Sequence, residues 1–288
     1  MKVLVTGSAG RVGRAIHARL AREHEVVGLD RVRSPTTEVV ASIEDAGRMR
    51  SALHEVQAVV HVAALHAPHV GQHAEAHFEM VNVDATEQLA RLAHQAGVRC
   101  FVFTSTTALY GAIGAGGVAT WVDEDTRPEP RTIYHQTKIE AERVLKAIAE
   151  DGTMAVTALR MSRCFPEPAP LMAAYRLHRG VDARDVADAH AAALTWNGPG
   201  FRRYVISSAT PFLPEDAPEL FTDAPTVLAR RAPALVAAFA ARGWPLPPSI
   251  DRVYDPRRAM SELGWQPRFG FEEVLAELDR GSPEVLPG

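Results

Sequence analysis

Short apolar runs alternate with helical stretches through the first 160 residues of the chain. The runs are continuous rather than alternating in polarity, which is typical of strands buried on both faces of a parallel sheet. Strands separated by helices of this length imply right-handed crossovers, with helices on both faces. The pattern therefore predicts an α/β fold with a doubly wound parallel sheet. The expected strands are Lys2–Thr6, Glu25–Asp30, Val39–Ile43, Gln57–Val62, Arg99–Ser105 and Met154–Arg160.

The composition excludes several other classes of protein. There are 31 Lys and Arg residues against 35 Asp and Glu, a net charge of −4, so no broad basic face is expected for a nucleic acid. Two cysteines, Cys100 and Cys164, are too few for a disulfide framework or a zinc ribbon. The chain opens directly on a strand, and no apolar run reaches the length of a membrane span. We therefore expect a soluble, cytoplasmic protein without nucleic-acid or membrane partners.

The segment Thr6-Gly7-Ser8-Ala9-Gly10-Arg11-Val12-Gly13 joins the first strand to a helix expected over 11–22. A tight strand-to-helix turn needs glycines. Backbone amides at the start of the helix can then face a pyrophosphate. An acidic residue, Asp30, also ends the second strand, so the context predicts a dinucleotide-binding loop rather than a generic turn. We expect the cofactor to contact Gly7, Ala9, Gly10, Arg11, Val12 and Gly13.

Asp30 bears on the choice between NAD and NADP. Its carboxylate can accept both hydroxyls of the adenosine ribose and would repel a 2′-phosphate. Arg31 and Arg33 follow at once, and guanidinium groups there can hold a 2′-phosphate. We predict NAD because Asp30 occupies the ribose position itself, with NADP as an alternative.

Tyr134 and Lys138 stand four residues apart on one face of a helix expected over 134–150. A tyrosine with a pKa near 10 is a poor base at neutral pH, and a nearby ammonium lowers that pKa. Such a tyrosine can exchange a proton with a substrate hydroxyl while nicotinamide exchanges a hydride at the same carbon. Polar residues at the end of a parallel strand, Thr104–Thr107, can orient the substrate oxygen. This order along the chain favours catalysis over a surface pair.

Motifs along most of the chain resemble those of the extended short-chain dehydrogenase/reductases, the NAD-dependent epimerase/dehydratase group. TGSAGRVG is similar to that family's TGxxGxxG, and YHQTK, after an acidic and proline-rich lead, to its YxxxK. VVHVAALHAP, FVFTSTTALYG, DARDVADAH and LGWQPRFGFEEVL resemble four further segments in the same order. The resemblance implies a Rossmann domain (residues 1–162 and 181–209) and a small C-terminal α/β substrate lobe (residues 163–180 and 210–288).

The resemblance also implies roles for particular residues. Tyr134 would be the acid and base, Lys138 would lower its pKa and hold the nicotinamide ribose, and Thr106 would bind the reacting oxygen. Asn82 would support the active site through a backbone or water hydrogen bond. Further residues expected beside the cofactor are Arg31, Ser42, Ile43, Val62, Ala63, Ala64, Thr104, Ser105, Tyr134, Lys138 and Met161.

Departures from the family pattern bear on the substrate. Only about 20 residues separate Phe165 from Asp185, where relatives that grip a nucleoside diphosphate have a longer insertion. A short lobe favours a small carbohydrate-like substrate, such as a free sugar, a sugar acid or a related hydroxy acid. Arg163 and Arg176 can grip a carboxylate or phosphate, or form salt bridges at the lobe junction. The candidate substrate contacts are His66, Thr107, Arg163 and Arg176.

Histidines crowd one segment of the chain. His69, His73 and His77 would share a helix face, and imidazoles at this spacing can chelate a metal. However, hydride chemistry needs no metal, and no carboxylate or thiol completes the set. We therefore predict a polar rim near the pocket and no metal site.

Together these features predict an NAD-dependent oxidoreductase or epimerase that acts by hydride transfer at a carbinol or ketone carbon. One alternative is a nucleotide-sugar epimerase of the same family. Another is a non-catalytic NAD(P)-sensing or scaffold protein, against which the intact set of Thr106, Tyr134 and Lys138 argues. Dehydration is disfavoured, because the family's dehydratases carry an Asp-Glu pair where this chain has Thr107-Ala108. By resemblance, helices over 75–96 and 134–150 would form a homodimer interface.

Overall fold

The computed structural model describes residues 1–111, 113–114, 116–150, 152–196 and 198–287. Its contacts divide the chain into two compact units, each made of three segments. The first unit contains Met1–Gly111, Pro128–Arg160 and Val186–Tyr204. The second contains Ala112–Arg127, Met161–Asp185 and Val205–Gly288. The second unit thus takes a segment, 112–127, that we expected to belong to the cofactor domain.

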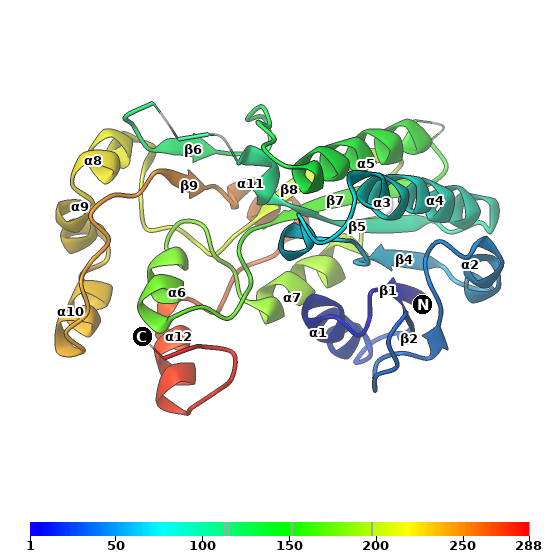
Figure 1. Cartoon of the computed structure of the whole chain (residues 1–288), viewed down its shortest axis with the longest axis horizontal. Coiled ribbons are helices and arrows are strands. Elements are labelled where there is room, and N and C mark those ends of the chain that lie inside the picture. The colour runs from blue at the N-terminus through cyan, green and yellow to red at the C-terminus, as the bar shows by residue number, and fades with distance from the viewer. Residues whose placement is uncertain (112, 115, 151, 197, 288) are drawn as a thin grey trace. The chain divides into compact units, whose positions relative to one another are not determined.

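A seven-stranded sheet organises the first unit (Figure 1). Its order is β3-β2-β1-β4-β5-β7-β8, and the pairs from β3 to β5 are parallel. This is the Rossmann order. Successive strands are added on one side of β1 up to β3 and on its other side from β4 onwards, so the strand order reverses between β1 and β4. The predicted fold is therefore confirmed. The strands are β1 (Lys2–Thr6), β2 (Glu25–Asp30), β3 (Val39–Val40), β4 (Ala58–His61), β5 (Cys100–Thr106), β7 (Ala155–Met161) and β8 (Gly200–Ile206).

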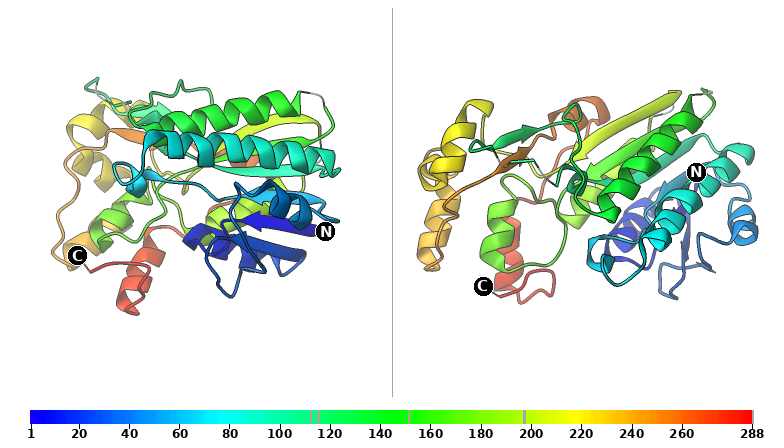
Figure 2. Two further views of the ribbon diagram at one scale, coloured as in Figure 1. Left: turned by 45° about the vertical axis from the view of Figure 1, so that its right-hand side comes forward. Right: turned by 45° about the horizontal axis from the view of Figure 1, so that its top comes forward.

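The central strands are buried along almost their whole length, as their continuous apolar runs predict. Helices α4 and α5 cover one face of the sheet, with α2 beside α4, while α1 and α7 cover the other (Figures 1 and 2). An ion pair between Arg19 of α1 and Asp188 of α7 (2.6 Å) joins the two helices on that second face. The helices are α1 (Arg11–Leu20), α2 (Ala46–Ala52), α4 (Ala85–Gln95), α5 (Ile133–Ala149) and α7 (Ala183–Ala193).

The prediction of a single helix over 75–96 is wrong in one respect. It consists of α3 (Glu75–Glu79), a π-helical turn (Met80–Asp84) and α4. A π-helical turn inserts one extra residue into the helix and is frequent at functional sites. Hydrophobic spacing cannot show such a turn, because the apolar face continues through it.

The second unit contains elements that the sequence patterns did not predict. Strands β6 (Thr120–Val122) and β9 (Arg252–Tyr254) pair in parallel although their paired residues lie 132 positions apart in the chain. Each has only three residues, too few for a periodicity to be recognised. Its helices are α6 (Ala169–Tyr175), α8 (Ala217–Thr222), α9 (Ala224–Arg231), α10 (Pro233–Ala241), α11 (Arg257–Leu263) and α12 (Phe271–Asp279).

Among the residues described, no helix is both long enough and apolar enough to cross a membrane.

Candidate active site

The loop between β1 and α1 is shaped by its glycines. Gly7 adopts a φ of +71°, which L side chains rarely adopt. A Cβ on Gly13 would lie 2.0 Å from the carbonyl oxygen of Gly7, so no side chain fits there. A Cβ on Gly10 would meet only one atom within 4 Å, the Gly7 oxygen at 3.3 Å. The turn is therefore closed on its inner side and open at Gly10, where helix α1 begins. This geometry fits an anion held by the start of the helix.

The segment after β4 lies against this loop. A Cβ on Gly7 would come within 2.7 Å of the amide nitrogen of Ala63. The hydroxyl of Thr6 accepts hydrogen bonds from the amides of Val62 (3.2 Å) and Ala63 (3.4 Å). The structure thus brings residues 62–64 to the phosphate loop, at the point where the strand order reverses and such sheets bind ligands.

The acidic residue at the end of β2 also faces the loop. The carboxylate of Asp30 accepts from the amides of Ala9 (3.0 Å) and Val32 (2.9 Å). Further along, Ser42 donates from its hydroxyl to Glu44 (2.8 Å), and Ile43 is buried in the core. A carboxylate fixed beside a glycine loop fits the ribose-binding role expected of Asp30.

Replacing Asp30 by Asn should shift cofactor preference towards NADP. The amide keeps one acceptor for the loop but removes the charge that repels a 2′-phosphate. A charged hydrogen-bond partner contributes about 1.5–3 kcal/mol, so the ratio of NAD to NADP affinity should fall about 10–100-fold. Titration of each cofactor against both proteins measures this. Glu25→Gln, at the other end of β2, is the matched control, and an unchanged ratio would contradict the assignment.

The three predicted catalytic residues come together where β5 meets α5. The hydroxyl of Thr106 acts on the phenol of Tyr134, whose pKa it lowers. The Thr106 oxygen also accepts from the amide of Ala108 (3.0 Å), which fixes the threonine at the start of a 3₁₀ turn, Thr107–Tyr110. Lys138 is buried one turn along α5 and donates from Nζ to the carbonyl oxygen of Thr104 (2.7 Å). The geometry therefore supports a hydroxyl, a phenol and an ammonium acting as one group.

Burial controls the protonation of this group. It raises the pKa of Tyr134 to about 12, and the hydrogen bond from Thr106 opposes it. Burial also lowers the pKa of Lys138 to about 7, against the charge of Glu142. We expected Lys138 to lower the pKa of Tyr134, but its Nζ lies on the Thr104 carbonyl and 3.9 Å from the centre of the Phe103 ring. In the chain alone, Tyr134 therefore holds its proton at neutral pH.

Asn82 supports this group from the π-helical turn. Its side chain accepts from the amide of Leu65 (2.8 Å) and donates to the carbonyl of Leu65 (2.9 Å). It also donates to the hydroxyl of Thr137 (3.1 Å), which donates in turn to the carbonyl of Tyr134 (3.1 Å). Asn82 thus joins the segment after β4 to the helix that carries Tyr134, through the backbone hydrogen bonds that the resemblance implied.

A buried histidine connects the same elements. The hydroxyl of Thr86 donates to the carbonyl of Asn82 (2.8 Å), so it accepts from Nε2–H of His61 (2.9 Å). The other ring nitrogen, Nδ1, then accepts from the hydroxyl of Thr6 (2.7 Å). Burial, with a smaller contribution from the charge of Lys138, lowers the pKa of His61 to about 3. The neutral ring therefore connects Thr6, before the phosphate loop, to Thr86 of helix α4.

Acid should destabilise the fold through such neutral histidines. Burial lowers the pKa of His190 to about 4, and its Nε2 accepts from the hydroxyl of Thr104 (2.8 Å). Between pH 6.5 and about 4 the unfolded chain takes up protons that folded His61 and His190 refuse, so stability falls as pH falls. By pH 4 the loss should be about 3 kcal/mol per histidine. Urea unfolding at pH 7 and pH 4 measures it. The exposed His54, replaced by Asn, should not alter the pH dependence.

Two residues expected near the cofactor have buried side chains engaged elsewhere. Thr104 contacts His190, and the hydroxyl of Ser105 donates to Glu142 (2.6 Å). Glu142 in turn pairs with Arg160 of β7 (2.6 Å). Sequence analysis missed this pair, although an arginine within the apolar strand AVTALRM is a signal, because a buried charge needs a partner.

The histidine segment forms a ladder of rings rather than one helix face. His66 stacks on His69 with ring centres 4.4 Å apart, His69 meets His73 at 5.6 Å, and His73 meets His77 at 5.1 Å. His69 ends a 3₁₀ turn, Ala67–His69, whereas His77 belongs to α3. In the described part of the chain, no three His, Cys, Asp or Glu side chains are grouped so that they could hold a metal.

The predicted substrate arginines lie in the second unit, where both form ion pairs. Arg163 pairs with Glu167, and Arg176 pairs with Asp182 (3.1 Å). Thr107 is buried in the 3₁₀ turn after β5 in the first unit. Met161 is the last residue of β7, and its side chain is half-buried. Contact of any of these residues with a substrate or a cofactor stays a prediction.

Comparison with known proteins identifies the class. Residues 3–169 match the model of the NAD dependent epimerase/dehydratase family. The chain therefore belongs to this family, within the extended short-chain dehydrogenase/reductases. This confirms the predicted class of enzyme and its cofactor, NAD, and the residues of the loop fit that cofactor.

Three similar proteins illustrate the range within the family. The UDP-glucose 4-epimerase of Klebsiella pneumoniae is 34% identical over 38% of this chain and 93% of its own. The 3-beta-hydroxysteroid dehydrogenase of Mycolicibacterium neoaurum is 31% identical over 53% of this chain, which spans only 45% of that protein. The solved structure of MoeE5 in complex with UDP-glucose and NAD is 25% identical and covers 97% of this chain and 98% of its own, with a TM-score of 0.70.

Proposed function

We propose that this protein is an NAD-dependent oxidoreductase or epimerase acting at a carbinol or ketone carbon of a small carbohydrate-like substrate. The observation that carries the proposal is the meeting of Thr106, at the end of β5, with Tyr134 and buried Lys138 on α5. When bound, NAD supplies the hydride acceptor or donor.

The chain's own residues would handle the proton and the orientation. Thr106 would orient the substrate oxygen, because its hydroxyl is fixed by the amide of Ala108. Tyr134 would pass a proton from its phenol oxygen to that oxygen in reduction and take one up in oxidation. Lys138 would hold the nicotinamide ribose with its ammonium group. Since Tyr134 holds its proton in the chain alone, the residues favour donation, and oxidation should quicken as the pH rises.

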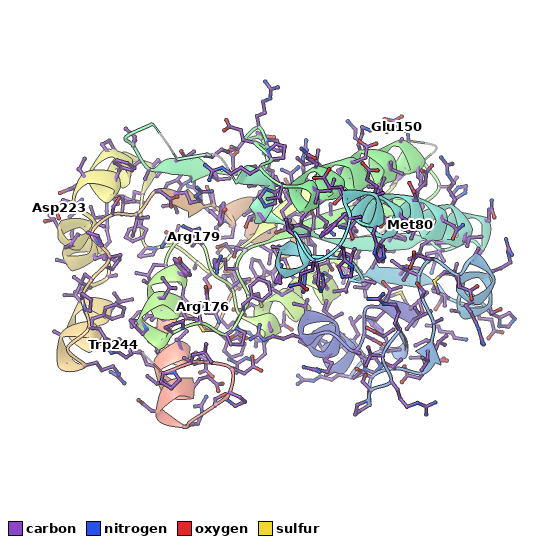
Figure 3. The ribbon with its side chains drawn as sticks, in the orientation of Figure 1. Met80, Glu150, Arg176, Arg179, Asp223 and Trp244 are labelled. Carbon is purple, nitrogen blue, oxygen red and sulfur yellow. The ribbon has the colours of Figure 1, made fainter. Side chains whose placement is uncertain are left out.

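The second unit supports a small substrate with an acid group. Between β7 and α7, residues 162–182 contain only one helix, α6. Arg179 lies near its end (Figure 3) and shares the carboxylate of Asp251 with Arg252, at 3.2 and 2.8 Å. A half-buried guanidinium with a shared counter-ion is suited to a sugar acid or phosphate. Arg163 and Arg176 remain candidates if their own carboxylate partners are displaced.

A nucleotide-sugar epimerase is the second candidate. It is favoured by the similarity of 38% of this chain to 93% of the length of the UDP-glucose 4-epimerase of Klebsiella pneumoniae. A non-catalytic NAD-sensing role is disfavoured by the retained Thr106, Tyr134 and Lys138.

A panel of free sugars, uronic acids, aldonic acids and nucleotide sugars, each incubated with the protein and NAD, tests the proposal. Net NADH formation with a free sugar or sugar acid is the expected result and indicates a dehydrogenase. Exchange of isomers without net NADH indicates an epimerase. Turnover of nucleotide sugars alone would contradict the small substrate, and NAD binding without any turnover would favour the sensing role.

We also propose a homodimer formed through α4 and α5, the helices that the family resemblance implies. Light scattering of the purified chain would show twice the 31.3 kDa mass of one chain if this is right.

A further inference from the structure

A buried ion pair lies behind the candidate catalytic residues. Arg160 of β7 donates from Nε and Nη2 to Glu142 of α5 at 2.9 and 2.6 Å. The two side chains are 2% and 6% exposed. Taking two charges out of water is costly, and an apolar pair of similar size often gives equal or greater stability. The pair therefore calls for an explanation beyond stability.

Each member of the pair is hydrogen-bonded to a residue near Thr106 in the chain. The hydroxyl of Ser105, just before it, donates to Oε1 of Glu142 at 2.6 Å. The phenol oxygen of Tyr110, at the end of the 3₁₀ turn after it, accepts from Nη1 of Arg160 at 2.5 Å. The chain on either side of Thr106 is thus fixed to one buried group, and two directional bonds define its position.

The same group belongs to the helix that carries the other catalytic residues. Glu142 follows Lys138 by four residues and Tyr134 by eight, so all three lie along one side of α5. Lys138 adds a third link, because its Nζ donates to the carbonyl of Thr104 on the same strand as Ser105. The charge of Glu142 also opposes the effect of burial on the pKa of Lys138.

We propose that Glu142 and Arg160 are positioning residues, whose ion pair holds residues 105–110 against α5 so that Thr106 keeps its place relative to Tyr134. This inference rests on the proposed function for its consequence in turnover. The geometric part, the dependence of the position of Thr106 relative to Tyr134 on the ion pair, can be measured without any substrate.

The test uses the carbon NMR signal of the phenol ring. The chain has five tyrosines, so labelling at ¹³Cζ gives five signals, and Tyr134→Phe assigns the one from Tyr134. Thr106→Val gives the position of that signal when the Thr106 hydroxyl is absent. Tyr110→Phe removes the phenol oxygen that accepts from Arg160 and leaves both charges in place. Glu142→Gln breaks the ion pair itself. Glu140→Gln, which breaks the exposed pair with Arg143 on the same helix, is the matched control.

In the full-length protein, the Tyr134 signal of Tyr110→Phe and Glu142→Gln should move towards its position in Thr106→Val, and that of Glu140→Gln should not. With a substrate, kcat should fall about tenfold in Tyr110→Phe while NAD affinity stays unchanged. A purely structural pair would lower the melting temperature and leave the Tyr134 signal at its wild-type position, which would overturn the proposal. If Glu142→Gln fails to fold, the Tyr134 signal of Tyr110→Phe alone decides between the two outcomes. A moved signal without turnover of any substrate would refute the proposed function only.

Discussion

Replacing Tyr134 by Phe should lower turnover about 10²–10⁴-fold, the range for loss of a general acid or base, while NAD binds as before. The Phe ring can occupy the same place, because the Tyr134 ring packs against the core beneath α5. Only the phenol oxygen, whose pKa the hydroxyl of Thr106 lowers, is lost. Initial rates with the substrate found in the panel measure turnover, and fluorescence titration measures NAD affinity.

A matched control distinguishes the catalytic phenol from a structural one. Tyr204→Phe removes the hydroxyl of a buried tyrosine on β8 and should leave turnover unchanged. If Tyr134→Phe turned over substrate at the wild-type rate, another group would have to move the proton, and Tyr134 would lose its assigned role. If it lost NAD affinity as well, the residue would serve mainly to shape the cofactor site.

The parts of the site that were predictable from sequence are those with local causes. A glycine loop between a strand and a helix requires neighbours in the chain only, so Gly7, Gly13 and Asp30 could be placed before the structure. The continuous apolar runs located the strands, and β1 and β2 begin and end where predicted, whereas β3 ends at Val40 rather than at Ile43. Tyr134 and Lys138 share a helix face because their spacing is close to one helical turn.

The parts that were not predictable depend on distant contacts. A supporting role was expected for Asn82, but its backbone partner, Leu65, lies 17 positions away, and hydrophobic spacing does not reveal the π-helical turn that contains Asn82. Arg160 and Glu142 lie 18 positions apart on different elements. Likewise, the Lys138 ammonium is directed to the Thr104 carbonyl, and burial rather than Lys138 sets the direction in which the pKa of Tyr134 shifts. Helical or strand periodicity locates a residue on an element, but the partner of a buried polar group is set by the fold as a whole.

Replacing Gly13 by Ala should abolish detectable NAD binding and destabilise the protein. The new Cβ would lie 2.0 Å from the oxygen and 2.8 Å from the carbonyl carbon of Gly7, and 3.0 Å from Cα of Ser8. All three are backbone atoms, so relief requires the loop to open and α1 to move away from it. Overpacking of this kind costs about 1–3 kcal/mol or more. Calorimetric titration with NAD and urea unfolding measure the two effects.

Gly10→Ala separates the cofactor from the fold, because its Cβ would meet only the Gly7 oxygen, at 3.3 Å. This variant should unfold at nearly the wild-type urea concentration, since a contact of 3.3 Å requires the Gly7 oxygen to shift by only a few tenths of an ångström. Its NAD affinity should nevertheless fall, because the methyl group would occupy the open side of the loop where a pyrophosphate must approach the backbone. Wild-type affinity in Gly10→Ala would mean that the cofactor does not pass over this residue. Wild-type affinity in Gly13→Ala would mean that the loop need not keep its present shape to bind NAD. The two variants thus test the open and the closed side of one turn. If the turn is a phosphate loop, both variants lose NAD affinity, and only Gly13→Ala also loses stability.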